Sequence, residues 1–235
     1  MLPVARRTTV KNDIRDRPAY PLAEAARYLK VPVATLRSWF LGRPYQTTRG
    51  PRQFPAIVPP ASRRPPVLSF YNLIEAHVLR ALRTDHGVPV LAVRQAISHA
   101  EGEFGIQRLL LSPELRTDAG RLFLDRYGAL IELSPSTQLY LRKVLEAYLK
   151  RVEWDQFQFP IRLYPFMTAE ASVAERPIAI DPAVAFGRPI LLRRGISTAV
   201  IAERIDAGES VEDLARDYDL TPADVEQAVL YERAA

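Results

Sequence analysis

The stretch YPLAEAARYLKVPVATLRSWFLGR, residues 20–43, predicts two short helices joined by a tight turn. Its first half places four apolar residues at helical spacing: Leu22, Ala25, Ala26 and Leu29. Val31 is expected to end the first helix, because a residue that precedes proline is disfavoured in helical geometry. Pro32 suits the first turn of the next helix, where its missing N–H group costs nothing. The stretch therefore predicts a helix–turn–helix pair.

The second helix is predicted to have one buried side and one exposed side. Helical spacing relates Val33, Leu36 and Phe40, which are expected to pack on the first helix, and Gly42 is expected to end the element. The other side is expected to display Thr35, Arg37, Ser38 and Trp39. In a DNA major groove an arginine can bind guanine O6 and N7 while Thr or Ser contacts a base edge or a phosphate. Helix–turn–helix pairs also occur as plain packing units, so both interpretations stay open at this point.

Positive charge is concentrated at the amino-terminal end of the chain. Residues 1–64 contain 13 Lys or Arg and 3 Asp or Glu, a net charge of +10. Residues 65–174 contain 12 of each, and residues 175–235 contain 7 against 12, a net charge of −5. Phosphate contacts dominate affinity for nucleic acids, so this distribution favours double-stranded DNA as a partner. The alternative, a solubilising tail, applies mainly to residues 1–17.

The composition narrows the class of protein. With 48% hydrophobic residues in 235, the chain can form one large domain or two to three small ones. It has no cysteine, which excludes disulfides and thiolate metal sites. No apolar run approaches the roughly 20 residues that span a bilayer, and the first residues lack the apolar core of a signal peptide. We therefore predict a soluble, cytoplasmic protein that does not enter the membrane.

Residues 42–66 contain two glycines, seven prolines and five arginines, a composition that excludes a helix. We predict two short strands, residues 53–58 and 67–70, around an arginine-tipped loop that forms the wing of a winged helix–turn–helix. The wing is expected to bring four arginines to phosphates beside the second helix: Arg49, Arg52, Arg63 and Arg64. A disordered basic linker is the alternative.

After this segment, Ser69 is expected to cap a helix over residues 70–85, and a shorter helix is expected over residues 90–100. With ATLRSWF in the second helix and LSFYNLIEAHVLRAL after the wing, residues 20–100 resemble the DNA-binding domain of the MerR family. The resemblance implies base or phosphate contacts from Thr35 and Arg37 and DNA-backbone contacts from Trp39 and Arg43. The chain departs from the family pattern at Ser38, where an aromatic residue is usual, and in its longer, proline-rich wing.

Residues 101–167 carry no motif and are predicted to form a mixed α/β middle segment. Short apolar runs lie between residues 109 and 133, followed by a leucine-rich helix from Ser136 or Thr137 to about Arg151. That helix is expected to be core, with a dimer seam as the alternative. Residues 152–167 alternate aromatic and polar residues and predict one or two strands, and residues 168–176 are a predicted linker.

Three further helices are predicted near the carboxyl end, over residues 198–206, 211–218 and 222–233, each preceded by Ser or Thr as a cap. Asp213 is expected to complete a capping box with Ser210, and Pro222 suits the first position of the last helix. The fold class is therefore mainly α with small β (α+β). Its predicted parts are a flexible basic arm (1–17), a winged helix–turn–helix (18–100), the middle segment, the linker, and a three-helix domain (177–235).

The motifs Ile-Asp-Pro, Phe-Gly-Arg-Pro, Ile-Ala-Glu-Arg and Leu-Ala-Arg-Asp-Tyr within residues 177–235 resemble a small bacterial helix–turn–helix domain of unassigned function. That domain is commonly encoded beside PIN-domain ribonucleases. A chain that carries it behind a MerR-like domain resembles the long VapB-type antitoxins of actinobacteria. The resemblance implies a protein that neutralises a PIN-domain ribonuclease toxin and represses its own operon. We expect it to bind its operator as a homodimer on an inverted repeat.

The last predicted helix is expected to show Asp224, Glu226 and Glu232 to solvent, where carboxylates would repel phosphates. We therefore predict that residues 177–235 contact protein rather than DNA. Deletion of residues 175–235 is expected to spare DNA binding and to weaken toxin neutralisation. The predicted toxin-binding residues are a basic cluster: Arg188, Arg193 and Arg194. Guanidinium groups pair well with carboxylates, which line the metal-binding active site of a PIN ribonuclease. Solvated loop charges are the alternative.

Motifs for catalysis are missing from the sequence. His99, Glu101 and Glu103 lack the ligand set and supporting residues of a metal site, and an exposed helix end explains them better. There is no phosphate-binding loop and no nucleophile in a recognisable motif. We predict no cofactor, no metal and no enzymatic activity. Two other functions stay open: a MerR-like regulator that senses a small ligand, and a protein-interaction adaptor that does not bind DNA.

Overall fold

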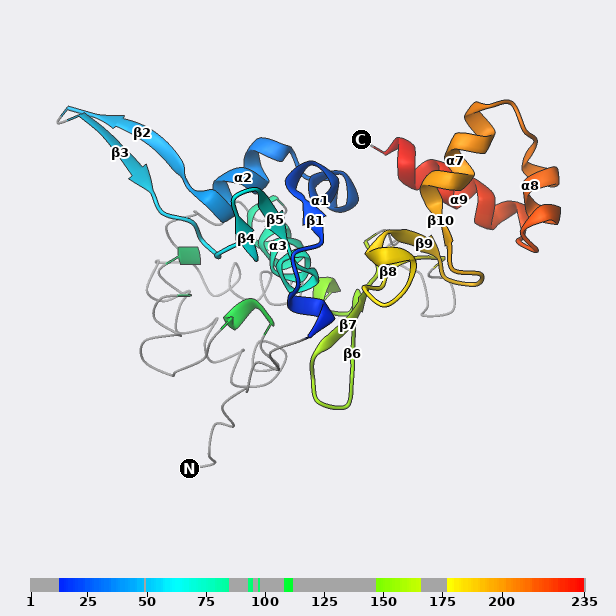
Figure 1. Cartoon of the computed structure of the whole chain (residues 1–235), viewed down its shortest axis with the longest axis horizontal. Coiled ribbons are helices and arrows are strands. Elements are labelled where there is room, and N and C mark those ends of the chain that lie inside the picture. Colours follow the sequence, from blue (N-terminus) through cyan, green and yellow to red (C-terminus); the bar gives the residue numbers. More distant parts are fainter. Residues whose placement is uncertain are drawn as a thin grey trace.

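The computed structural model of the chain describes residues 13–48, 50–84, 93–94, 97, 108–111, 147–165 and 177–234. Within these ranges, helices combine with small antiparallel sheets, which is the α+β class that the sequence predicts (Figure 1). One hydrophobic core runs from the helix–turn–helix pair into the central sheet, and a second lies within the carboxyl-terminal helices. None of the described helices is long and apolar enough to span a bilayer.

The helix–turn–helix pair consists of α1 (Leu22–Leu29) and α2 (Val33–Leu41). The predicted apolar face of α1 is buried, with Leu22, Ala25, Ala26 and Leu29 all in the core. Lys30 ends α1 in the left-handed conformation, and the Val31 N–H group then donates to the Ala26 carbonyl oxygen at 3.0 Å. The turn is thus closed by backbone hydrogen bonds.

The burial of two residues of α2 differs from the prediction. Trp39 is 2% exposed, and Val33, expected in the core, is 42% exposed. The reason is tertiary: the Ile57 N–H group donates to the Trp39 carbonyl oxygen at 2.7 Å, so the chain after the wing closes over the last turn of α2. The buried stripe of α2 is therefore Leu36, Trp39 and Phe40, and Val33 lies one turn before it.

The wing begins earlier than predicted. Strands β2 (Arg43–Thr47) and β3 (Gly50–Phe54) form an antiparallel hairpin in which Arg43 pairs with Phe54 and Tyr45 with Arg52. Figure 1 shows this hairpin extending away from the helices. The predicted wing, made of strands over residues 53–58 and 67–70, was wrong. The hairpin starts directly after Gly42, its second strand ends at Phe54, and the chain from residue 55 returns to α2. Val67 and Leu68 do lie in a strand, but that strand is not part of this hairpin.

A second, smaller hairpin follows, formed by β4 (Ser62–Arg63) and β5 (Pro66–Leu68). Strand β5 also pairs with β1 (Tyr20–Pro21), the strand that leads into α1. Helix α3 (Phe70–Thr84) begins where Ser69 predicts, since the Asn72 N–H group donates to Ser69 Oγ at 3.2 Å. Of the helix predicted over residues 90–100, Val93, Arg94 and Ile97 are described and are helical.

A five-stranded antiparallel sheet contains β6 (Val152–Trp154), β7 (Pro160–Leu163), β8 (Ile178–Ile180), β9 (Pro189–Leu191) and β10 (Ile196–Ser197), in the order β10-β9-β8-β7-β6. The predicted strands within residues 152–167 are confirmed. Leu163 of β7 pairs with Ile180 of β8, so strands from both sides of the predicted linker share one sheet. The apolar runs expected at residues 112–133, the start of the leucine-rich helix and the linker lie outside the described residues.

The carboxyl-terminal helices are α7 (Thr198–Asp206), α8 (Val211–Asp217) and α9 (Pro222–Arg233), at the predicted positions. Thr221 and Asp224 form a complete capping box on α9. On α8 the Ser210 hydroxyl accepts from the Asp213 N–H group and donates to the Asp213 carboxylate, so only half of the predicted box is formed. Ser197 precedes α7 without a side-chain capping bond.

Helix α9, near the carboxyl end of the chain, packs against α1 of the helix–turn–helix pair. The Tyr231 hydroxyl donates to the Tyr28 carbonyl oxygen at 2.9 Å, and Glu232 lies 3.7 Å from the Arg27 guanidinium group. The Glu232 carboxylate also accepts a hydrogen bond from the Thr198 hydroxyl. The prediction that Glu232 faces solvent was wrong, because α1 covers that end of α9.

Candidate nucleic-acid interface

The exposed side of α2 and the base of the wing enclose one concave surface of about 830 Å³. Its lining residues come from α2, the wing, the end of α3 and the following segment: Ala34, Thr35, Arg37, Ser38, Trp39, Gly42, Arg43, Pro44, Phe54, Arg83 and Arg94. Four of these are arginines, and none of the described lining residues carries a carboxylate. This surface, which we call the arginine cleft, therefore concentrates positive charge beside α2. An exposed helix of this kind fits the width of a DNA major groove.

Helix α2 presents the predicted reading residues to the cleft. Arg37 is exposed, whereas Thr35 and Ser38 are half-buried one turn apart on the same helix. The Thr35 N–H group donates to the Pro32 carbonyl oxygen at 2.9 Å, which fixes the first turn of α2. Trp39 also borders the cleft, but its side chain is in the core. Its predicted contact with the DNA backbone was therefore wrong for the side chain, which holds α2 in place instead.

The root of the wing is built on a pair of stacked aromatic rings. Tyr45 and Phe54 lie across the hairpin with ring centroids 4.0 Å apart. The Arg43 guanidinium group lies 5.5 Å from the Phe54 ring centroid, and that of Arg94 lies 5.9 Å from it. Such cation–π contacts hold both guanidinium groups at the mouth of the cleft. Gly42 is required here, because a Cβ atom at this position would lie 2.1 Å from the Phe54 carbonyl oxygen.

Sequence reasoning missed Arg83 and Arg94. Arg94 donates to the Pro55 carbonyl oxygen at 2.6 Å, which ties the segment after α3 to the end of the wing. Neither arginine belongs to a local motif, and each reaches the cleft only because α3 passes beneath the wing. The charge distribution gave no signal for them either, because residues 65–174 carry no net charge.

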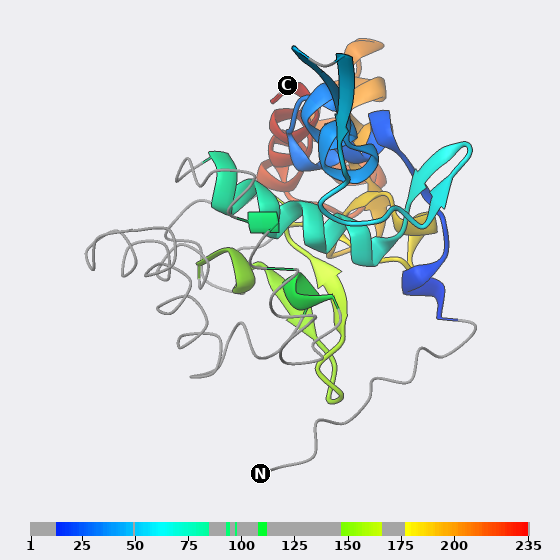
Figure 2. The ribbon, with the colours of Figure 1, turned by 90° about the vertical axis from the view of Figure 1, so that its left-hand side faces the viewer.

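The predicted wing arginines do not all meet at the cleft. Arg52 is exposed on β3, in the wing itself, and Arg49 lies outside the described residues. Arg63 and Arg64 are exposed on the β4–β5 hairpin, which projects in a different direction from the wing (Figure 2). The structure therefore brings Arg37 and Arg43 together at the cleft, places Arg52 on the wing, and places Arg63 and Arg64 on a separate hairpin.

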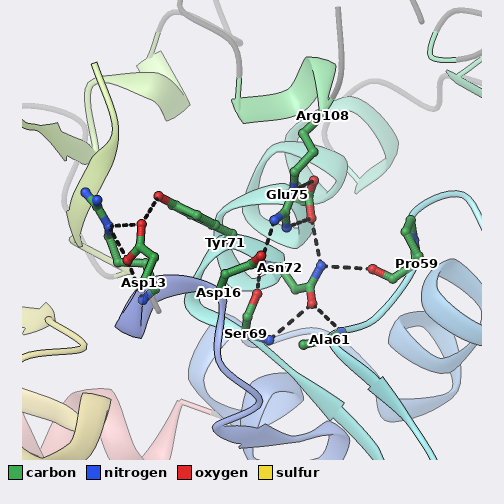
Figure 3. Close-up of polar contacts among 10 residues, drawn as sticks. Asp13, Asp16, Pro59, Ala61, Ser69, Tyr71, Asn72, Glu75 and Arg108 are labelled. Carbon is green, nitrogen blue, oxygen red and sulfur yellow. Dashed lines mark hydrogen bonds and ion pairs between the residues drawn. The ribbon is translucent and has the colours of Figure 1, made fainter. Parts of the chain in front are cut away.

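A buried polar network positions α3 beneath the wing (Figure 3). The Asn72 side chain accepts from the N–H groups of Ala61 and Ser69 and donates to the Pro59 carbonyl oxygen at 3.1 Å. It also donates to Glu75, which is 1% exposed, at 2.8 Å. The chain that returns from the wing is thereby fixed to the start of α3.

Arg108 neutralises the negative charge of Glu75 in this network. Its guanidinium group forms two hydrogen bonds with Glu75, at 3.0 and 2.9 Å, and one with Asp16 at 2.7 Å. Burial lowers the pKa of Arg108, but the two carboxylates outweigh burial and raise its pKa above the ordinary value. The buried Glu75 carboxylate is thus paired, as a buried charge must be.

Residues 13–17, which the sequence assigns to the flexible arm, are held in place. Asp13 caps the short helix η1 (Ile14–Asp16), and its carboxylate accepts from the Tyr71 hydroxyl at 2.8 Å. Burial raises the pKa of Asp13, but hydrogen bonds from Arg15 and Tyr71 outweigh it and lower the pKa overall. Arg15 also pairs with Asp155 in the β6–β7 hairpin at 2.9 Å. Figures 1 and 2 show η1 well below α2, so residues 14–16 lie away from the arginine cleft.

The three arginines predicted to bind the toxin lie directly before and after β9. Arg188 and Arg193 are exposed, before and after that strand. Arg194 forms an ion pair with the Asp219 carboxylate and donates to the Asp219 carbonyl oxygen at 3.1 Å. Arg194 therefore makes intramolecular contacts with Asp219, whereas Arg188 and Arg193 are exposed to solvent. The residues considered for a metal site, His99, Glu101 and Glu103, lie outside the described residues.

Family comparisons agree with this arrangement. Residues 18–97 match the family described as "Putative DNA-binding HTH domain", and residues 178–231 match "Protein of unknown function (DUF433)". The fold and the family matches thus define a helix–turn–helix protein, with a domain of a putative DNA-binding family followed by a carboxyl-terminal domain.

Whole-chain relatives extend the comparison. The chain is 30% identical to "Putative antitoxin VapB45" of Mycobacterium tuberculosis, an alignment that covers 91% of this chain and 93% of that protein. It is 29% identical to "Uncharacterized protein Rv2308" of the same organism, over 92% and 90%. It is also similar to the crystal structure of Rv2018 from Mycobacterium tuberculosis, with a TM-score of 0.64 and 25% identity over 90% and 97% of the two chains. The chain belongs to the family of VapB-type antitoxins.

Proposed function

We propose that this antitoxin binds the operator of its own operon through α2 and the β2–β3 wing. The observation that carries the proposal is the arginine cleft, where Arg37, Arg43, Arg83 and Arg94 face one surface that has no carboxylate among its described lining residues. A nucleic acid is the partner that such a surface favours, because its phosphates supply the missing negative charge.

The proposed roles follow from position. Helix α2 enters the major groove, where exposed Arg37 binds guanine O6 and N7, and Thr35 or Ser38 contacts a base edge or a phosphate. Arg43 and Arg52 lie on the wing and contact phosphates, which set the register of the complex without reading sequence. We further propose that the protein binds as a homodimer to an inverted repeat, with half-sites roughly 34–36 Å apart.

We also propose that residues 177–235 bind and neutralise a PIN-domain ribonuclease. Three features support a protein partner for this domain. Its net charge is negative, α9 displays Glu226 to solvent while its exposed Arg233 is paired with Asp206, and Arg188 and Arg193 are exposed beside β9. The relative that is 30% identical is named as an antitoxin, which supports a toxin as that partner.

The DNA-binding proposal is tested by measuring affinity for the DNA upstream of the gene at several salt concentrations. Arg37→Ala is expected to weaken specific binding more than binding to random DNA. Arg52→Ala is expected to weaken both equally and to reduce the salt slope by about one unit. Arg216→Ala, which removes an exposed arginine on α8, serves as the control and should change neither. Equal effects of Arg37→Ala and Arg216→Ala would overturn the assignment of α2 to the groove.

A further inference from the structure

The loop between β8 and β9 holds an aromatic side chain out in solvent. Phe186, in the short helix η5 (Ala185–Gly187), is 91% exposed, more than any other large hydrophobic residue that the structure describes. A single exposed apolar residue is common on protein surfaces. What distinguishes Phe186 is the backbone that carries it.

Three successive residues of this loop adopt the left-handed conformation. The φ angles are +48° for Ala185, +57° for Phe186 and +74° for Gly187. Residues other than glycine rarely adopt this conformation, and they keep it only where the surrounding structure enforces it. Ala185 and Phe186 are both non-glycine residues in this conformation, so contacts elsewhere must hold the backbone of the loop in place.

The contacts that enforce the loop come from both sides. Gly187 lies against the buried Tyr20 of β1, since a Cβ atom at this position would be 2.0 Å from the Tyr20 hydroxyl oxygen. At the start of the loop, the Asp181 carboxylate accepts from the Ala183 N–H group and from the Arg162 guanidinium group, each at 2.9 Å. The loop is therefore fixed at both ends, and Phe186 is presented to solvent by a rigid support.

The surface around Phe186 is cationic. Arg188 is exposed two residues later, and Arg193 is exposed in the β9–β10 turn. That turn approaches the loop, because a Cβ atom at Gly195 would lie 3.6 Å from Val184 Cγ1. The nearby Asp181 carboxylate is buried and neutralised by Arg162. An aromatic anchor flanked by arginines is the composition of energetically dominant sites in protein interfaces.

We propose that Phe186 is the central anchor of the toxin-binding site and inserts into an apolar pocket rimmed by carboxylates on the partner protein. The inference rests on the proposed antitoxin function, whose toxin is the partner. Arg188 and Arg193 pair with the carboxylate rim. A protein is favoured over DNA as the partner because β8 and β9 lie apart from the wing and α2 in Figure 1 and because residues 175–235 carry a net negative charge.

The experiment measures binding of the full chain to the proposed partner, a PIN-domain ribonuclease, together with binding to the proposed operator DNA. Phe186→Ser is expected to raise the dissociation constant for the nuclease at least tenfold and to leave operator affinity within twofold. Phe157→Ser removes another exposed phenylalanine, 70% exposed at the β6–β7 hairpin, and is expected to change neither. Arg188→Glu is expected to weaken nuclease binding through charge reversal. Thermal melting confirms that each variant is folded.

The outcomes separate this inference from the function on which it rests. If the unaltered chain does not bind the nuclease, the proposed neutralisation fails, and this inference fails with it. If the unaltered chain binds and Phe186→Ser binds equally well, only the inference is overturned. A Phe186→Ser variant that loses operator affinity instead would assign the loop to DNA, where an inserted apolar side chain can wedge between base steps, and would equally overturn it.

Discussion

Tyr231, in the last helix, donates its hydroxyl hydrogen bond to the carbonyl oxygen of Tyr28, in the first helix of the helix–turn–helix pair, at 2.9 Å. The two residues are 203 positions apart in the sequence. Lys30, which ends α1, also places its ammonium nitrogen 4.3 Å from the Tyr231 ring centroid. The carboxyl-terminal domain therefore packs against α1, the helix that precedes α2 in the helix–turn–helix pair.

Tyr231→Phe is expected to reduce the free energy of unfolding by about 1–2 kcal/mol, because it leaves the buried Tyr28 carbonyl oxygen without its hydrogen bond from Tyr231. Urea unfolding measures the change. Tyr45→Phe is the matched control, since it keeps the ring that stacks on Phe54, and it should cost less than about 0.5 kcal/mol. Equal costs would show that the hydrogen bond between Tyr231 of α9 and Tyr28 of α1 does not contribute to stability.

Gly42→Ala tests the junction between α2 and the wing. The φ angle of Gly42 is +78°, and a Cβ atom there would collide with the Phe54 carbonyl oxygen. Gly208→Ala is the control, because Gly208 has a φ angle of +96° and open space around its Cβ position. Gly208→Ala should cost about 1–2 kcal/mol from backbone conformation alone. Gly42→Ala should cost more in urea unfolding and should also weaken operator binding; a smaller cost than that of Gly208→Ala would contradict the geometry.

Because Arg108 and Glu75 form an ion pair, substitutions at the two positions are expected to have non-additive effects on the free energy of unfolding. Arg108→Met leaves Glu75 buried and without its guanidinium partner, and breaking such a pair typically costs about 3–5 kcal/mol. Glu75→Gln removes the buried charge, so the double variant should be more stable than Arg108→Met alone. A thermodynamic cycle on unfolding free energies measures the coupling. Additive effects would mean that the two side chains do not interact.

His77 predicts how stability depends on pH. Burial lowers the pKa of His77 to about 3, against an ordinary value of 6.5, while its ring contacts the Tyr148 carbonyl oxygen at 3.2 Å. Below pH 6.5 the unfolded chain binds a proton at this residue and the folded chain does not, so stability falls as the pH is lowered from 6.5 toward 3. The slope for one residue approaches about 1.4 kcal/mol per pH unit. His77→Gln should flatten the decline between pH 6.5 and 5, and an unchanged slope would exclude His77 as its source.

Local signals in the sequence predicted the local structure correctly. Ser69, Ser210 and Thr221 stand where their helices begin, and the apolar face of α1 is in the core. The errors depended on contacts between distant segments. Trp39 is buried because residues 57–58 cover it, and Glu232 is covered because α9 packs on α1. Arg83 and Arg94 join the candidate site through the path of α3, which no motif of a few residues encodes.

For the deletion of residues 175–235, the structure and the sequence predict different results. The sequence alone predicts that DNA binding survives, whereas the structure predicts that it is lost. The deletion removes β8, which pairs with β7 through Leu163 and Ile180, and it removes α9 from the surface of α1. It therefore exposes apolar surface of the shared core, to which Leu163 and Ile180 both belong. We expect the truncated chain to unfold at lower urea concentration and to lose operator affinity. A truncated chain that binds the operator with full affinity and unchanged stability would show that the amino-terminal helix pair folds without the support of α9.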